Sequence, residues 1–127
     1  MVKITSESLV PQPIIDSVKR DDCGAIVSFV GTIRDNTHGH RVASLEIQPV
    51  DDKAEEKLGR VAEEVKQKWQ IRDVAIWRRT GKLKAGEVAL VIAVASPHRP
   101  EAFRACEYII DRIKEGDITT EKETFAD

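Results

Sequence analysis

The chain has 127 residues, a length that fits one domain. Its formal net charge is −2, whereas nucleic-acid-binding proteins are typically basic. Apolar residues make up 41% of the chain and charged residues 33%, and no stretch approaches the ~20 apolar residues that cross a membrane. The first ten residues hold no apolar run of the signal-peptide kind. We therefore expect a single domain over residues 1–127, in the cytoplasm, that binds neither nucleic acid nor a membrane.

Four secondary-structure elements are predicted in the first half of the chain. In order they are a strand at residues 2–6, a short helix opened by Pro11 and Pro13, a buried strand at 25–33 and a half-buried strand at 41–48. The helix follows because proline is tolerated in a first turn. The sequence AIVSFVGTI is β-branched and apolar, whereas the later strand alternates polar with apolar residues. A polar segment rich in turn formers, RDNTHGH, predicts a loop between these two strands.

Four more elements are predicted in the second half: a helix at 51–69, a strand at 72–79, a strand at 88–95 and a helix at 100–114. Both helices carry an apolar stripe at helical spacing. The strand VALVIAVA is continuously apolar, as expected of a central strand covered on both faces. The residues after Gly116 show no clear period. The resulting order, β-α-β-β-α-β-β-α, favours an α+β fold over a doubly wound one.

The segment SPHRP (96–100) joins the most apolar strand to the last helix. Pro100 favours a helix start at that position, so His98 and Arg99 would lie beside the free backbone N–H groups of a helix N-terminus. Such a position suits a phosphate or a carboxylate, and these side chains add a bidentate donor and a group that titrates near neutral pH. The alternative is a solvated loop whose basic residues have no role, and the sequence leaves both open.

Other cations also follow predicted strands. Arg34 comes directly after the first buried strand, where a charged residue often marks only the exit of the strand to solvent. A basic run begins at the end of the strand at 72–79 and extends past it; it consists of Arg78, Arg79, Lys82 and Lys84. This run predicts either the solvated face of a hairpin or a docking surface for an anion or an acidic partner.

No metal site is predicted. His38 and His40 have no third ligand nearby. Cys23 and Cys106 lie far apart in no metal-like spacing, so we interpret them as small buried thiols in a reducing compartment. Lys114 ends the last helix, where a cation suits the helix dipole.

Two segments, SFVGTIRDNTHG (28–39) and SPHRPEAF (96–103), together carry a resemblance to a known family. Further matching positions lie between and after them in the family's order and spacing. The matches are Phe29, Gly31, Arg34, Leu45, Glu46, Pro49, Arg79, Gly81, Leu83, Gly86, Glu87, Ser96, His98, Arg99, Ala102, Phe103 and Lys114. On these positions the chain resembles the large, catalytic subunit of molybdopterin synthase.

The resemblance implies an α/β hammerhead fold, a central homodimer and a heterotetramer with small ubiquitin-like sulfur-carrier subunits. The glycine-glycine tail of the carrier bears a thiocarboxylate, whose sulfur is transferred to cyclic pyranopterin monophosphate. The product is the dithiolene of molybdopterin. The large subunit would need no metal or other cofactor, and neither cysteine would act as a nucleophile because the sulfur arrives on the partner.

The resemblance also implies site residues. Lys114 and Lys122 would be catalytic, and the substrate would be bound by Thr32, Ile33, Arg34, His98, Arg99, Glu121 and Glu123. Counted without gaps from Lys114, the second active-site lysine of the family falls on Glu121, and Lys122 replaces it only with a one-residue slip. A carboxylate there would repel both a phosphate and a thiocarboxylate. The alternative is therefore a diverged, non-catalytic paralogue that binds the sulfur carrier or a pterin or phosphate ligand.

Overall fold

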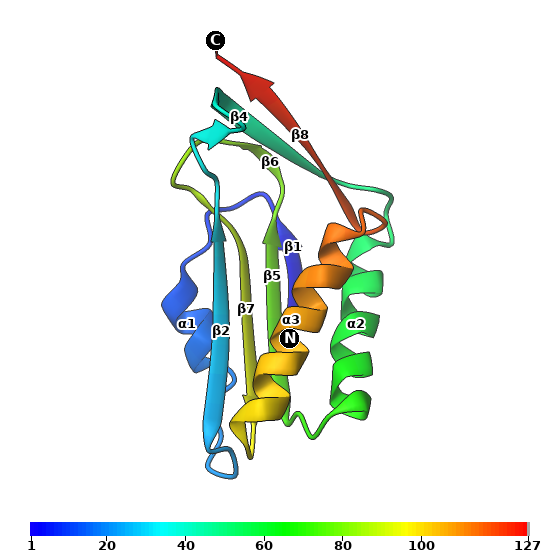
Figure 1. Cartoon of the computed structure of the whole chain (residues 1–127). Helices are drawn as coiled ribbons and strands as arrows, with labels where there is room; N and C mark the ends of the chain where they lie inside the picture. The colour runs from blue at the N-terminus through cyan, green and yellow to red at the C-terminus, as the bar shows by residue number, and fades with distance from the viewer. Residues whose placement is uncertain (127) are drawn as a thin grey trace.

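Two sheets form the framework of the computed structural model, which describes residues 1–126. The first sheet has the order β1-β5-β7-β2, with bounds Val2–Thr5, Asp73–Arg79, Val88–Ser96 and Ala25–Thr32. Strand β1 runs parallel to β5, and the other two pairings are antiparallel. In Figure 1 this sheet stands upright, and the second sheet crosses its upper end.

Strand β4 (His40–Pro49) is the shared strand of the second sheet. It pairs antiparallel with β3 (Asn36–Thr37), β6 (Gly81–Leu83) and β8 (Thr119–Phe125). A small apolar core joins this sheet to the end of the first one. Its buried members are Ile33, Ile47, Leu83 and Ala89.

Helices cover both faces of the first sheet. Helices α2 (Ala54–Lys68) and α3 (Arg99–Lys114) lie side by side on one face, and α1 (Pro11–Asp16) lies on the other (Figure 1). Leu58 of α2 and Ile109 of α3 belong to the main core, which these helices share with β5 and β7. The apolar stripes predicted for both long helices are therefore the faces that they bury.

Strand β7 confirms the prediction of a central strand covered on both faces. Every residue from 89 to 96 is buried, and the strand lies between β5 and β2. Helix α3 begins at Arg99, one residue before the predicted start, with Pro100 in its first turn. The mixed α+β class is confirmed as well.

The predicted order of elements ends at the last helix and lacks one strand of the tail, because residues 119–125 form strand β8 along β4. Most of its side chains are exposed, so no apolar alternation marks the strand in the sequence. Backbone pairing with β4, rather than burial, makes it a strand. For the same reason the short strand β3 lies inside the predicted loop RDNTHGH, and β6 lies between the predicted strands at 72–79 and 88–95.

Candidate active site

A cavity of about 420 Å³ opens where the end of the first sheet, the end of α3 and the second sheet meet. Segments far apart in the sequence supply its walls. Of the residues predicted to act on or bind a substrate, those that line the cavity are Thr32, Ile33, Arg34, Lys114, Glu121 and Glu123. His98, Arg99 and Lys122 lie elsewhere in the described chain.

One wall of the cavity is a row of residues paired across the first sheet. Gly31, Leu90 and Arg78 lie opposite one another on β2, β7 and β5, and all three line the cavity. A Cβ atom at Gly31 would lie only 3.1 Å from Cε2 of Phe29. The missing side chain at position 31 therefore leaves space for the cavity beside the phenylalanine ring.

The end of β2 is anchored by its backbone. The register between β2 and β7 shifts between Gly31 and Thr32. Beyond this irregularity the Ile33 N–H donates to the carbonyl oxygen of Glu87 at 3.0 Å, and the Ile33 carbonyl accepts from the Gly86 N–H at 2.8 Å. Ile33 is buried, while Thr32 on one side of it and the following arginine on the other are exposed along the cavity. The predicted exit of the strand to solvent is thus also a wall of the cavity.

Arg78 is the buried cation of this site. It belongs to the basic run for which a solvated hairpin face and a docking surface for an anion or an acidic partner were both predicted. Its residue exposure is 4%, so the predicted basic run does not form one solvated face. Its Nε atom donates to Oγ1 of Thr119 at 3.2 Å, and an Nη2 hydrogen goes to Oε2 of Glu121 at 3.0 Å. The signal was present in the sequence, because Arg78 shares the inward-facing positions of β5 with Val74 and Ile76.

Strand β8 turns its alternate side chains to opposite faces of the second sheet. Glu121 and Glu123 line the cavity, and Glu123 accepts a hydrogen bond of 2.6 Å from Oγ1 of Thr37. Lys122 lines a separate groove of about 120 Å³ together with Lys82. The register pairs Glu121 with Ile47 of β4, so the one-residue slip that would turn Lys122 inward does not occur here. A catalytic role for Lys122 stays a prediction.

His98 and Arg99 lie at the other end of α3 from Lys114. The helix has 16 residues, so its two ends are about 24 Å apart at 1.5 Å per residue. His98 has extended backbone angles and precedes the first turn, as predicted. Both side chains are exposed, and within one chain they do not join the cavity.

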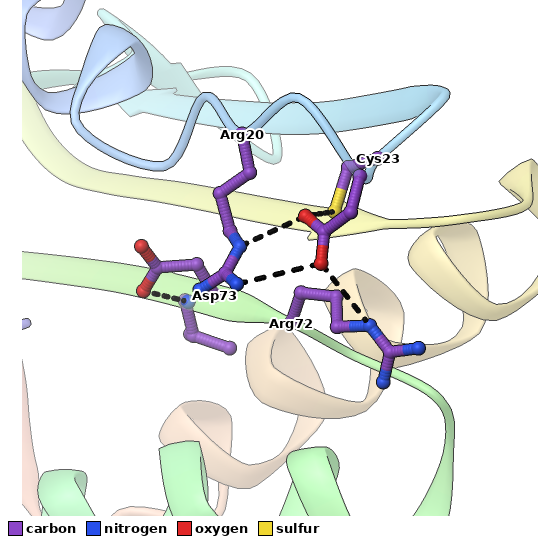
Figure 2. Close-up of polar contacts among 6 residues, drawn as sticks. Arg20, Cys23, Arg72 and Asp73 are labelled. Carbon is purple, nitrogen blue, oxygen red and sulfur yellow. Dashed lines mark hydrogen bonds and ion pairs between the residues drawn. The ribbon is translucent and has the colours of Figure 1, made fainter.

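Neither thiol is prepared as a nucleophile. Burial, followed by the charge of Asp22, raises the pKa of Cys23, whose thiol donates to that carboxylate at 3.6 Å. Burial raises the pKa of Cys106 to about 11. Figure 2 shows the surroundings of Cys23, where Asp22 also accepts from Arg20 at 3.0 Å and lies 3.7 Å from Nε of Arg72. This cluster precedes β2 and so lies at the end of that strand remote from the cavity.

Within residues 1–126, no group of three or more histidine, cysteine, aspartate or glutamate side chains is placed to hold a metal ion. None of the described helices combines the length and the apolar character needed to cross a membrane. Fold and site together define an α+β domain with a cavity of mixed charge. Three cations of that cavity, Arg34, Arg78 and Lys114, are available to an anionic ligand.

Comparison with known proteins identifies the family. The MoaE protein family model matches residues 4–116. The molybdopterin synthase catalytic subunit of Thermoplasma volcanium is 42% identical over 114 residues, which cover 90% of this chain and 83% of that protein. The corresponding protein of Bacillus subtilis is 39% identical over 125 residues, covering 98% and 80%. The crystal structure of molybdopterin synthase from Staphylococcus aureus matches with a TM-score of 0.89 and 35% identity, covering 98% of this chain and 90% of that one. The chain belongs to the MoaE family.

Proposed function

We propose that this chain is the catalytic subunit of a molybdopterin synthase, which transfers sulfur to cyclic pyranopterin monophosphate. The observation that carries the proposal is the cavity itself. The end of β2, the end of α3 and one face of β8 bring Arg34, Lys114 and Glu123 to its walls, although the sequence separates them by up to 89 positions (123 − 34). Membership of the MoaE family, whose relatives carry the name of this enzyme, supports the same activity.

The chemistry we propose uses the partner's sulfur. A small ubiquitin-like carrier inserts its C-terminal thiocarboxylate into the cavity, and its sulfur forms a bond to a carbon atom of the pterin substrate. Water then cleaves the acyl–sulfur bond, which leaves the sulfur on the substrate and the carrier as a carboxylate. Lys114 would donate hydrogen bonds or a proton near the thiocarboxylate carbonyl, and Arg34 would bind the phosphate. No protein nucleophile is required. This agrees with Cys23 and Cys106, whose pKa values are both raised and neither of which lines the cavity.

A homodimer would complete the site with residues from a second copy. In one chain, His98 and Arg99 lie about a helix length from the cavity, yet the family resemblance assigns both to substrate binding. We propose that each cavity receives these two side chains from the other copy. Ile26 and Val30, 41% and 40% exposed on the end strand β2, offer apolar surface for that contact. With one sulfur carrier per copy the assembly is a heterotetramer, and we propose that it works in the cytoplasm.

A non-catalytic paralogue is the second candidate function, and Glu121 is the observation that favours it. Its carboxylate lines the cavity where the family resemblance expects a lysine. Such a protein would retain the fold and bind the sulfur carrier or a pterin without turnover.

A single-turnover assay separates the two candidates. The purified protein is mixed with thiocarboxylated sulfur carrier and cyclic pyranopterin monophosphate, and the dithiolene product is followed by mass spectrometry. We expect product from the unmodified protein. Absence of product, together with product from Glu121→Lys, would instead establish the paralogue. The variant Lys122→Ala tests the other predicted lysine, because loss of product there would require β8 to shift its register during the reaction.

A further inference from the structure

The cavity contains one charged side chain that is almost fully removed from water. Arg78 is 4% exposed, and it is the only buried member of the charged residues among positions 1–126. A buried guanidinium is expensive to desolvate and is retained where partners compensate its charge. Arg34 and Lys114, the other cations that line the cavity, are exposed. Arg78 therefore differs from these two cations, because its charge is buried and theirs are solvated.

Two hydrogen bonds fix the plane of the Arg78 guanidinium. They go to Thr119 and Glu121 and use two of the five N–H donors that an arginine carries. No other hydrogen bond of the Arg78 side chain occurs within the described residues. Because the residue lines the cavity, the remaining donors are available to a molecule that enters it.

The carboxylate of Glu121 does not prevent the positive charge of Arg78 from attracting an anion that enters the cavity. The Glu121 side chain is 46% exposed, whereas that of Arg78 is 5% exposed. The carboxylate therefore remains solvated, and the guanidinium is oriented from one side. Glu123 is engaged by Thr37. The cavity consequently holds three cations against two carboxylates, and its most buried charge is positive.

We propose that Arg78 is an anion-binding residue of the active site and that Thr119 and Glu121 position its guanidinium. The inference rests on the proposed function for the identity of the anion. That anion is either the phosphate of cyclic pyranopterin monophosphate or the C-terminal carboxylate-type group of the sulfur carrier. Both would accept charge-assisted hydrogen bonds from the free edge of the guanidinium. In this arrangement Glu121 orients Arg78 of β5. The positive charge of Arg78 offsets the repulsion expected between the Glu121 carboxylate and an anionic substrate.

Calorimetric titration with each anion in turn tests this role. Arg78→Gln is expected to weaken binding about ten- to hundredfold, the equivalent of one charge-assisted hydrogen bond. Glu121→Gln removes the charge of the partner but keeps a side-chain oxygen that can accept from the Arg78 guanidinium, so it is expected to bind the anion more tightly. A purely structural ion pair would behave differently, since both variants would lower the melting temperature alike and neither would change the affinity. Equal affinities of the two variants would overturn the proposal.

Arg79→Gln is the matched control. Arg79 is the next residue of β5, its Nη1 lies 3.3 Å from Oε2 of Glu87, and it does not line the cavity. Losing that ion pair should leave anion binding unchanged. If Arg78→Gln fails to fold because Glu121 is left unpaired, the double variant Arg78→Gln/Glu121→Gln answers the question. Affinity in that double variant equal to the affinity of Glu121→Gln alone would also overturn the proposal.

The arms of the titration identify the anion. Weakened binding of cyclic pyranopterin monophosphate alone assigns Arg78 to the phosphate. Weakened binding of the unmodified carrier, with no effect on a carrier that lacks its last two glycines, assigns Arg78 to the partner's terminus. If the unmodified protein shows no turnover, the proposed function fails, and inorganic phosphate becomes the probe. Phosphate binding that is lost in Arg78→Gln would still support the anion site, and its absence in the unmodified protein would overturn it.

Discussion

Lys114 occupies the last position of α3 and lines the cavity while its side chain stays exposed. We expect Lys114→Ala to lower single-turnover product formation by about a hundredfold or more, the usual contribution of a positioned proton donor. The fold should not change, because an exposed side chain leaves no void. Lys66→Ala is the control and should retain activity, because Lys66 is half-buried on α2 and does not line the cavity. Full activity of Lys114→Ala would remove this lysine from the mechanism.

Gly31 is required by space rather than by backbone conformation. An added Cβ would meet Cε2 of Phe29 at 3.1 Å, so the ring must shift toward the cavity or the strand must move. We expect Gly31→Ala to fold, with an unchanged circular dichroism spectrum, and to bind cyclic pyranopterin monophosphate more weakly. Gly59→Ala is a useful comparison, since no atom lies within 4 Å of a Cβ there. Unaltered affinity of Gly31→Ala would mean that substrate does not approach this wall.

At the scale of single residues, the sequence could predict which residues belong to the site more readily than which ion pairs they form. Arg34 and Lys114 were assigned to the site by the family resemblance, whereas their positions at the ends of a strand and a helix also suited residues without a role; both line the cavity. Arg78 was grouped with exposed neighbours, although the period of two along β5 puts it on the inward face. Its partner Glu121 lies 43 positions away. Nothing local could show that the two charges meet.

Helix α2 is tied to the rest of the molecule near its first turn by Asp51. One carboxylate oxygen accepts from the Lys53 N–H at 2.9 Å, and the other accepts from Nζ of Lys57 at 3.1 Å. Lys57 also donates to the carbonyl oxygen of Asp117 at 3.1 Å, just beyond α3. The hydrogen bonds from Lys53 and Lys57 lower the pKa of Asp51. The charged form of Asp51 therefore stabilises the folded state.

This pKa shift predicts how stability depends on pH. A lowered folded-state pKa contributes stability that is present above the ordinary aspartate pKa of about 3.9 and is lost as the pH falls through the folded value. Asp51→Asn should therefore unfold at lower urea concentration than the unmodified protein at pH 7, and the difference should narrow at pH 3. Asp52→Asn removes a charge from the same helix end without those contacts among the described residues. An equal effect of both variants would assign the stabilisation to the helix dipole alone.

Helices and strands could be predicted from the sequence where a buried face requires apolar residues at regular spacing. Strand β7 and the helices α2 and α3 bury whole faces, and their periods revealed them. Strand β8 buries little and is specified by its pairing partner β4. That pairing determines which charged side chains of β8 face the cavity. The local sequence could therefore not show whether Glu121 or Lys122 lies there.

At the scale of the whole molecule, the length of α3 separates two groups of predicted site residues. Chain order and the resemblance could assign both groups to one function, but they could not show that a single chain keeps them apart. If a second copy brings His98 and Arg99 to the cavity, as proposed, two different inactive variants can together form one complete site. A site built from one chain does not allow this.

Complementation between inactive variants tests this assembly. Lys114→Ala and Arg99→Ala should each lose activity, and co-expression should restore part of it, because a mixed dimer contains one site with both residues intact. Co-expression of Lys114→Ala with Arg34→Ala should restore nothing, since both changes lie in the cavity contributed by one copy. Light scattering checks that each variant is a dimer. Arg99→Ala with full activity, or a monomeric unmodified protein, would contradict the shared site.

The position of β8 has a further consequence, for solubility. One edge of this strand pairs with β4, and in the described sheet its other edge pairs with no strand. An unpaired edge is a template for strands of other molecules, and charged side chains are a common protection against such pairing. The consecutive charges Glu121, Lys122 and Glu123 supply that protection here. Neutralising them one after another should therefore lower the concentration at which the protein begins to aggregate, whatever happens to its activity.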